Sequence, residues 1–343
     1  MRSPSTMLCI SVLASSVTVR AVGLVDALKN AGASQFASLI TSDPIIASLY
    51  LSSNVGTVFA PIDSSSPSRM KRQSPEERQK LKYQSTRQTN HIGDINKPPG
   101  KPLDTNNDDA NVGAGNQQKV VTNPQDGTGN SSMKRGVIGR RSNMTMPSLL
   151  NIYSGLGNNV SIIQAGIPYD GGVIHIVNDY FTLPTSLSST ASTNGQSSFN
   201  QMSKTSNMSA SLDSTASITC FIPSNAAFSA SNSSSYSTSS SLISGHVIPN
   251  FVGYLPSLTD GATFTTQGGT KITVTVKNGD YFINNAKIIA SNQIISNGVA
   301  HVIDSVIEPK SPPLIVSAAP AQERGVMLGV WSLVFCLVAS LLV

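Results

Sequence analysis

Two kinds of hydrophobic pattern run along the chain. Residues 22–50 carry apolar side chains at helical spacing, for example Val25 and Leu28, and this spacing predicts helices. From Ile272 to Val276 apolar and polar residues alternate, as they do in a half-buried strand. The Asn278–Gly279 pair that follows predicts a two-residue hairpin turn. The chain therefore combines helices with strands.

Two short apolar phrases occur twice, in the same order. The first is "TVFAP" at 57–61 and "TCFIP" at 219–223, each a β-type run that ends in proline. The second is "GVIHIVNDYFTLP" at 172–184 and "GVAHVIDSVIEP" at 298–309. A pair of phrases repeated over such a period predicts a duplicated domain. At 343 residues, the chain is long enough for about two domains.

The first copy is longer than the second. Pro61 and His175 are 114 positions apart, whereas Pro223 and His301 are 78 apart. The difference of 36 residues indicates an insertion. We assign it to the polar stretch around 86–140, where apolar periodicity is lost and turn-forming residues dominate, so that no regular structure is expected there.

Just before this stretch, residues 74–85 have the signature of a helix start. Ser74 can cap the helix, Pro75 suits the first helical position, and Glu77 stands three residues after the cap.

The positive charge is concentrated in one segment. Residues 69–141 hold 14 of the 23 Lys and Arg residues against 7 acidic residues, so the rest of the chain has a net charge of −2. Tyr83 is the only aromatic residue in this segment, whereas nucleic-acid binding favours aromatic residues among the basic ones on a folded face. We therefore expect no nucleic-acid partner. The dibasic pairs at 71–72, 134–135 and 140–141 are either cleavage sites for a secretory protease or solvated charge.

Both ends of the chain carry processing signals. Residues 1–21 combine Arg2, an apolar run and small residues before Ala21, which predicts a secretory signal peptide, with a buried first helix as the alternative. Residues 326–343 form an uncharged apolar tail, and the preceding segment 311–325 contains small residues and a polar spacer. This is the pattern of a glycosylphosphatidylinositol (GPI) anchor signal. The expected attachment residue is Ser317, with Ala318 and Ala319 as alternatives, and the tail would be removed.

The remaining composition fits an extracellular protein. Only 12% of residues are charged. Removal of both ends would leave Cys220 as the one cysteine, expected to pack in an apolar run. Five sequons are candidate glycosylation sites on exposed loops. They are Asn130, Asn143, Asn159, Asn207 and Asn232.

The histidine phrase could suggest catalysis through His301, Asp304 and Ser305. Side chains at 301 and 304 would point to opposite faces of a strand, and neighbours on one strand cannot build a hydrolase triad. The first copy does not repeat the set. The four histidines of the chain also lack metal-ligand spacing. We therefore predict no catalytic, metal-binding or cofactor-binding residue, and expect His301 and Asp304 to satisfy backbone or loop groups.

The repeated phrases resemble the fasciclin domain family. In that family a phrase such as "TVFAP" opens the domain, a phrase such as "GVIHVID" closes it, and a histidine phrase ending in proline lies between them. "GHVIPN" fits this middle place in the second half, whereas the nearest fit in the first half, Tyr83–Gln84, lacks the histidine. Asp63 and Asn225 follow the opening phrase and suit the cap of a following helix. The residues that carry the resemblance are Phe59, Pro61, Asp63, His175, Phe221, Pro223, Asn225, His246, Pro249, His301 and Asp304.

The resemblance implies an α+β protein with two tandem fasciclin-like domains, each a β-wedge or sandwich with packed helices, at 22–184 and 185–310. It implies a non-enzymatic role in cell adhesion or cell-wall and matrix organisation, similar to two-domain fasciclin proteins of filamentous fungi. Surface or matrix proteins or glycans would be the partners, at the extracellular face of the plasma membrane or in the wall. The alternative is an extracellular module that binds a small ligand or a glycan.

Overall fold

The computed structural model describes residues 22–52, 54–65, 74–108, 112–113, 116–124, 149–231 and 238–307. These residues belong to one compact unit. The predicted signal peptide, the attachment region with Ser317, Ala318 and Ala319, and the apolar tail lie outside them. Within the described ranges, no helix is both long and apolar enough to cross a membrane.

The first half combines helices with one sheet, as its patterns predict. Its helices are α1 (Leu24–Asn30), α2 (Ser34–Ser42), α3 (Pro44–Tyr50), α4 (Pro75–Tyr83) and α5 (Ile92–Ile95), with a 3₁₀ turn η1 (Asp63–Ser65). Its strands are β1 (Thr57–Pro61), β2 (Ser85–Thr86), β3 (Pro102–Asp104), β4 (Lys119–Asn123), β5 (Leu150–Tyr153), β6 (Asn159–Tyr169) and β7 (Gly172–Val177). Ser74 and Glu77 form the predicted capping box on α4.

The second half is built in the same way. Its helices are α6 (Leu187–Thr193), α7 (Ser197–Thr205), α8 (Ser209–Ser214), α9 (Asn225–Ala230) and α10 (Ser239–Ser244), with a 3₁₀ turn η3 (Leu255–Ser257). Its strands are β8 (Ile218–Pro223), β9 (Val247–Ile248), β10 (Thr263–Thr265), β11 (Lys271–Lys277), β12 (Asp280–Ile283), β13 (Ala286–Ile295) and β14 (Gly298–Ile303). The predicted hairpin turn joins β11 to β12, and both of its residues, Asn278 and Gly279, have positive φ.

The two sheets have the same topology. The described strands form one sheet in the order β2-β1-β7-β6-β5-β4-β3 and another in the order β9-β8-β14-β13-β12-β11-β10. In each sheet the strand of the proline phrase pairs in parallel with the strand of the histidine phrase, β1 with β7 and β8 with β14. The tandem α+β architecture expected from the repeat is thus confirmed.

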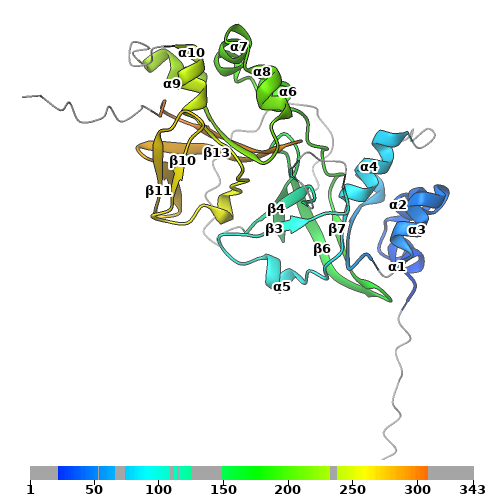
Figure 1. Cartoon of the computed structure of the whole chain (residues 1–343). Helices are drawn as coiled ribbons and strands as arrows, with labels where there is room; N and C mark the ends of the chain where they lie inside the picture. Colours follow the sequence, from blue (N-terminus) through cyan, green and yellow to red (C-terminus); the bar gives the residue numbers. More distant parts are fainter. Residues whose placement is uncertain are drawn as a thin grey trace, which may run out of the picture. The chain divides into compact units, whose positions relative to one another are not determined.

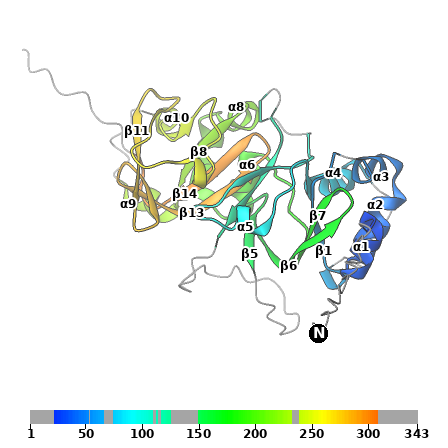
Figure 2. The ribbon, with the colours of Figure 1, turned by 90° about the horizontal axis from the view of Figure 1, so that it is seen from below.

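Each half packs a helical layer on one face of its sheet. Figures 1 and 2 both show α1, α2 and α3 grouped beside β7, and Figure 2 shows β1 next to them. Phe36 from α2 and Ile174 from β7 belong to the core on this side, whereas Phe59 faces a second cluster with Phe181 on the other side. The second half repeats this division, with α6, α7, α8 and α10 over one face. Two apolar clusters per domain are the main source of its stability.

The structure corrects the position of the insertion. Residues 86–124 are not irregular, because they contain α5, β3 and β4, and these two strands occupy the places of β10 and β11. The extra length lies mainly between β4 and β5. Leu150 comes 27 positions after Asn123, whereas in the second half Asp280 comes 3 positions after Lys277.

The sequence did not predict β3 and β4 because many residues around them are polar. In the structure several of these polar side chains are buried and hydrogen-bonded. Thr105 is fully buried and its hydroxyl donates to the carbonyl of Gln118 at 2.6 Å. The side-chain amide of Asn106, also buried, donates to Ser85 Oγ at 2.8 Å. Such residues read as turn formers in a sequence, although here they satisfy the edge of a sheet.

Candidate functional site

The repeated histidines lie beside the central parallel strand pair of each domain. The strand register places His175 opposite Phe59 and His301 opposite Phe221. In each pair the two rings stack, with centroids 5.6 Å apart in the first domain and 5.8 Å apart in the second. Both histidines are completely buried. The phrase therefore places an imidazole in the core, where it needs internal partners.

One ring nitrogen of each histidine meets a loop carbonyl. His175 Nε2 lies 2.8 Å from the carbonyl oxygen of Asn90, and His301 Nε2 lies 2.9 Å from that of Gly253. Because a carbonyl only accepts, Nε2 must carry the proton in both rings. Each histidine thus fastens a loop to the centre of its sheet.

The other ring nitrogen serves a bulge in the neighbouring strand. The N–H groups of Gly166 and Asn292 donate to Nδ1 of His175 and His301, both at 3.3 Å. Gly166 and Asn292 have positive φ and lie where the register of β6–β7 and β13–β14 shifts. A bulge leaves a backbone amide without its ladder partner, and the imidazole supplies the acceptor.

Burial also fixes the protonation state of these rings. Desolvation lowers the pKa of His301 to about 4, and it lowers the pKa of His175 below its usual range. Both rings are therefore neutral near pH 7, and the nitrogens that would exchange protons are occupied by backbone groups. This geometry suits a structural role.

The triad suggested by the sequence is not assembled. Asp304 is exposed, and its Oδ1 accepts the backbone N–H of Lys287 at 2.8 Å and the hydroxyl of Ser305 at 3.0 Å. Asn178 plays the same part in the first domain, where its Oδ1 accepts the N–H of Ser161 at 2.8 Å. In the part of the chain that the structure describes, no three His, Cys, Asp or Glu side chains are grouped so that they could hold a metal ion.

Asp63 and Asn225 act as caps, but not of the helix that follows them. The Asp63 carboxylate accepts the N–H groups of Ser34 at 3.0 Å and Gln35 at 2.8 Å, at the start of the earlier helix α2. Asn225 Oδ1 likewise accepts the N–H of Ser198 at 3.0 Å, at the start of α7. The expectation that each residue caps the helix after it was therefore wrong. The end of the parallel strand lies beside the start of an earlier helix. Helix α9, which follows β8, is capped by Ser224 instead.

This return cap has a measurable contribution. Asp63→Ala should lower the free energy of unfolding of the first domain by about 1 kcal/mol, because two amides at the start of α2 lose their acceptor. Asp26→Ala, which removes an exposed carboxylate from α1, is the matched control and should change it by no more than a few tenths of a kcal/mol. Urea denaturation of both variants measures the difference. Equal losses would contradict the capping role.

The middle phrase differs between the domains. In the second, His246 Nδ1 donates to the carbonyl of Leu242 at 2.7 Å, and Nε2 accepts the N–H of Ile307 at 2.9 Å. Pro249 follows directly after β9. Gln84 takes the place of His246 in the first domain. The N–H of Phe221 donates to the carbonyl of His246, and the N–H of Phe59 donates in the same way to the carbonyl of Gln84.

Sequence reasoning missed the glycine that begins each histidine phrase. A Cβ on Gly298 would lie 1.9 Å from the carbonyl oxygen of Ile218, and one on Gly172 would lie 1.9 Å from that of Gly56. Glycine is required where two backbones approach this closely. The signal was present, since both copies of the phrase open with Gly.

Comparison with known proteins agrees with this geometry. The fasciclin domain model matches residues 194–309, which include β8 to β14 and the buried His246 and His301. This part of the chain is similar to the fasciclin domain. The first half has the same strand order and the same stacked histidine, so the two halves share one fold.

Fasciclin-like arabinogalactan proteins of fungi are similar to this chain. One from Cercospora beticola is 31% identical over 188 residues, which are 53% of this chain and 50% of that protein. One from Arthroderma benhamiae is 30% identical over 162 residues (46% and 38%), and one from Phaeosphaeria nodorum 30% over 157 residues (45% and 50%). The chain thus spans about half or less of the length of these relatives.

A solved structure is also similar. It is that of a FAS1 domain pair from the insect cell adhesion molecule Fasciclin I, and the match covers 81% of this chain and 97% of that one. The sequence identity is 18% and the TM-score 0.38.

Candidate modification sites lie on the outside of the fasciclin domains. Asn159 at the start of β6 and Asn207 after α7 are exposed. Asn130, Asn143 and Asn232 fall outside the described residues. Cys220 is buried in β8, where desolvation raises the pKa of its thiol far above the usual range, so it packs as an apolar side chain.

The two fasciclin domains also contact each other. Gln118 Nε2 donates to the carbonyl of Ile295 at 3.0 Å, and the N–H of Leu156 donates to that of Ile294 at 3.3 Å. An apolar cluster draws on both sheets at this junction. It contains Val121, Tyr153, Tyr254, Ile294 and Val299. The domains therefore pair through buried side chains and through backbone groups.

Proposed function

We propose that this protein is a secreted, glycosylated surface protein that acts in cell adhesion or in the organisation of the cell wall or matrix. The observation that carries the proposal is the use of the motif residues. Both ring nitrogens of His175 and of His301 are hydrogen-bonded to backbone groups, so these histidines stabilise the fold and are not free to act on a ligand. Function then belongs to the exposed surface of the domain pair.

Two exposed sequons support this proposal. The exposed sequons Asn159 and Asn207 offer attachment points for glycans in the first and second domain. The similar fungal proteins are named fasciclin-like arabinogalactan proteins, which supports a glycosylated product of the secretory pathway. Partners would be proteins or glycans of neighbouring surfaces or of the matrix.

A lipid anchor at Ser317, Ala318 or Ala319 would hold the protein at the extracellular face of the plasma membrane or pass it to the wall. The uncharged tail 326–343 and the small residues before it support this proposal. Removal of the tail in exchange for the lipid would leave the two fasciclin domains outside the cell.

Phosphatidylinositol-specific phospholipase should release the full-length protein from intact cells into the medium, because the enzyme cleaves the lipid from a GPI anchor. Immunoblotting of cells and medium measures the release. A chain that ends at residue 325 should appear in the medium without the enzyme. If the full chain stays with the membrane after both phospholipase treatment and wall digestion, the anchor is not GPI.

A further inference from the structure

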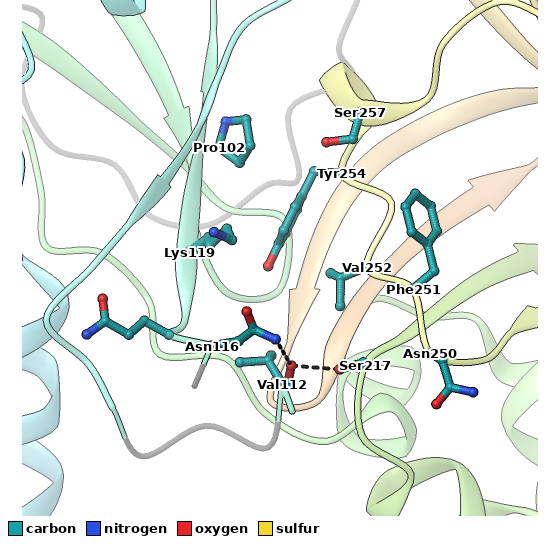
Figure 3. A pocket seen from close by; sticks show the side chains of 11 residues that line it. Pro102, Val112, Asn116, Lys119, Ser217, Asn250, Phe251, Val252, Tyr254 and Ser257 are labelled. Carbon is teal, nitrogen blue, oxygen red and sulfur yellow. Dashed lines mark hydrogen bonds between the residues drawn. The ribbon is translucent and has the colours of Figure 1, made fainter. Parts of the chain in front are cut away.

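A cavity of about 360 Å³ opens where the two fasciclin domains meet. Pro102 and Lys119 line it from β3 and β4 of the first domain, and Phe251 and Tyr254 line it from the loop after β9 of the second. Figure 3 shows these side chains around one space, with the ribbons of both domains beside it. The volume lies within the usual range for small-molecule sites.

Tyr254 is the unusual member of this lining. The residue is 2% exposed, and its hydroxyl makes no hydrogen bond to another described residue. Figure 3 shows the ring reaching down between Lys119 and Val252, with the hydroxyl directed toward Asn116. A hydroxyl that borders a cavity can donate a hydrogen bond to a ligand there and accept one from it. Burial raises the pKa of Tyr254 well above its usual range, so the group remains a neutral donor and acceptor.

The other polar groups around the cavity are neutral or already paired. Asn116 Nδ2 and Ser217 Oγ both donate to the carbonyl of Val112, at 3.1 Å and 2.6 Å, which leaves oxygen lone pairs on both side chains for a ligand. The Lys119 ammonium group forms an ion pair with Asp104. The cavity thus offers no uncompensated positive charge to attract an anion.

Apolar surface completes the lining. Pro102, Phe251 and Val252 present carbon atoms to the same space (Figure 3). A purely apolar ligand would leave the hydroxyl of Tyr254 unpaired, and a strongly charged one would lose hydration without gaining a partner. A neutral molecule with hydroxyl groups on its edge and C–H groups on its face matches this lining.

We propose that this cavity binds one neutral pyranose unit of a glycan, with the Tyr254 hydroxyl hydrogen-bonded to a sugar hydroxyl. The proposal deepens the adhesion role by naming a partner class, and for its biological meaning it rests on the proposed surface location. Because both domains supply the lining, binding requires their pairing.

The test uses the full-length chain, expressed in a fungal host and purified in the form that the host produces. Methyl α-mannopyranoside, methyl β-glucopyranoside and methyl β-galactopyranoside are titrated separately, with sodium glucuronate as the charged comparison, and binding is followed by saturation-transfer NMR. We expect saturable binding of at least one neutral pyranoside in preference to glucuronate.

Two variants locate the site. Tyr254→Phe removes an oxygen that makes no hydrogen bond to another described residue, so it should keep the thermal midpoint and weaken binding about tenfold. Tyr281→Phe removes the same oxygen from a half-buried tyrosine on β12 and should bind normally. Ser257→Trp places a large ring at the exposed rim and should abolish binding.

Three results would overturn the proposal. They are no saturable binding of any of the three pyranosides, a preference for glucuronate, and equal binding by wild type, Tyr254→Phe and Ser257→Trp. Failure of the lipid anchor would leave the outcome in solution unchanged. The two proposals therefore fail separately.

Discussion

Acidification from pH 6.5 to pH 4 should destabilise the second fasciclin domain by several kcal/mol. Burial lowers the pKa of both His246 and His301 from 6.5 to about 4 in the folded state. Between pH 6.5 and pH 4 these histidines bind more protons in the unfolded chain than in the folded one. The stabilisation that comes from their neutral state is therefore fully present above pH 6.5 and is lost as the pH falls toward 4. Each histidine accounts for about 3 kcal/mol of this loss.

The first domain suggests the variant that tests this loss. Gln84 holds the place of His246 there, and a glutamine does not titrate. His246→Gln should therefore reduce the pH dependence of the unfolding free energy by about half in this window. Urea denaturation at a series of pH values measures it. Unfolding free energies of the wild type that are equal at pH 6.5 and pH 4 would contradict the buried, neutral state of these rings.

Gly298→Ala should destabilise the second domain by about 3 kcal/mol or more. Its Cβ would stand 1.9 Å from the carbonyl oxygen of Ile218, and this atom belongs to backbone that cannot turn away as a side chain can. Relief requires that β14 and β8 separate, although these strands carry His301 and Phe221. Overpacking against backbone belongs to the severe end of mutational effects.

The matched control is Gly269→Ala, at a glycine with φ 78° and open space around its Cβ. It should cost only about 1–2 kcal/mol, through backbone strain alone. Hydrogen exchange of the β8 and β14 amides in both variants gives the local stability. A Gly298→Ala protein whose amides are protected as well as those of Gly269→Ala would show that the close approach is unimportant.

The sequence predicted the structure best where the hydrogen bonds of a segment are made by residues close to it in the chain. The capping box at Ser74 and the hairpin turn at Asn278–Gly279 depend on neighbouring residues, and both are formed as predicted. The two stacked histidines repeat because each serves its own bulge and its own loop, so the phrase had to be copied with the domain. Features of this kind can be recognised from the order of residues alone.

Features that depend on distant segments were not predictable in this way. The choice of helix capped by Asp63 depends on where β1 ends relative to α2, and the sequence does not state this arrangement. Strands β3 and β4 were missed because they are short and their polar neighbours are satisfied by tertiary partners. The junction cavity joins Lys119 to Tyr254 only after both domains have folded and paired.

Adhesion by the domain pair is tested most directly by cell aggregation. Non-adherent yeast cells that display the full-length chain are compared with cells that display the same anchor region without residues 22–309, and the size of the aggregates is measured by light scattering. We predict large aggregates only with the full chain, and their dispersal after phospholipase treatment. If the full chain is detected at the surface and the cells remain as dispersed as the control cells, the protein does not act as an adhesion module.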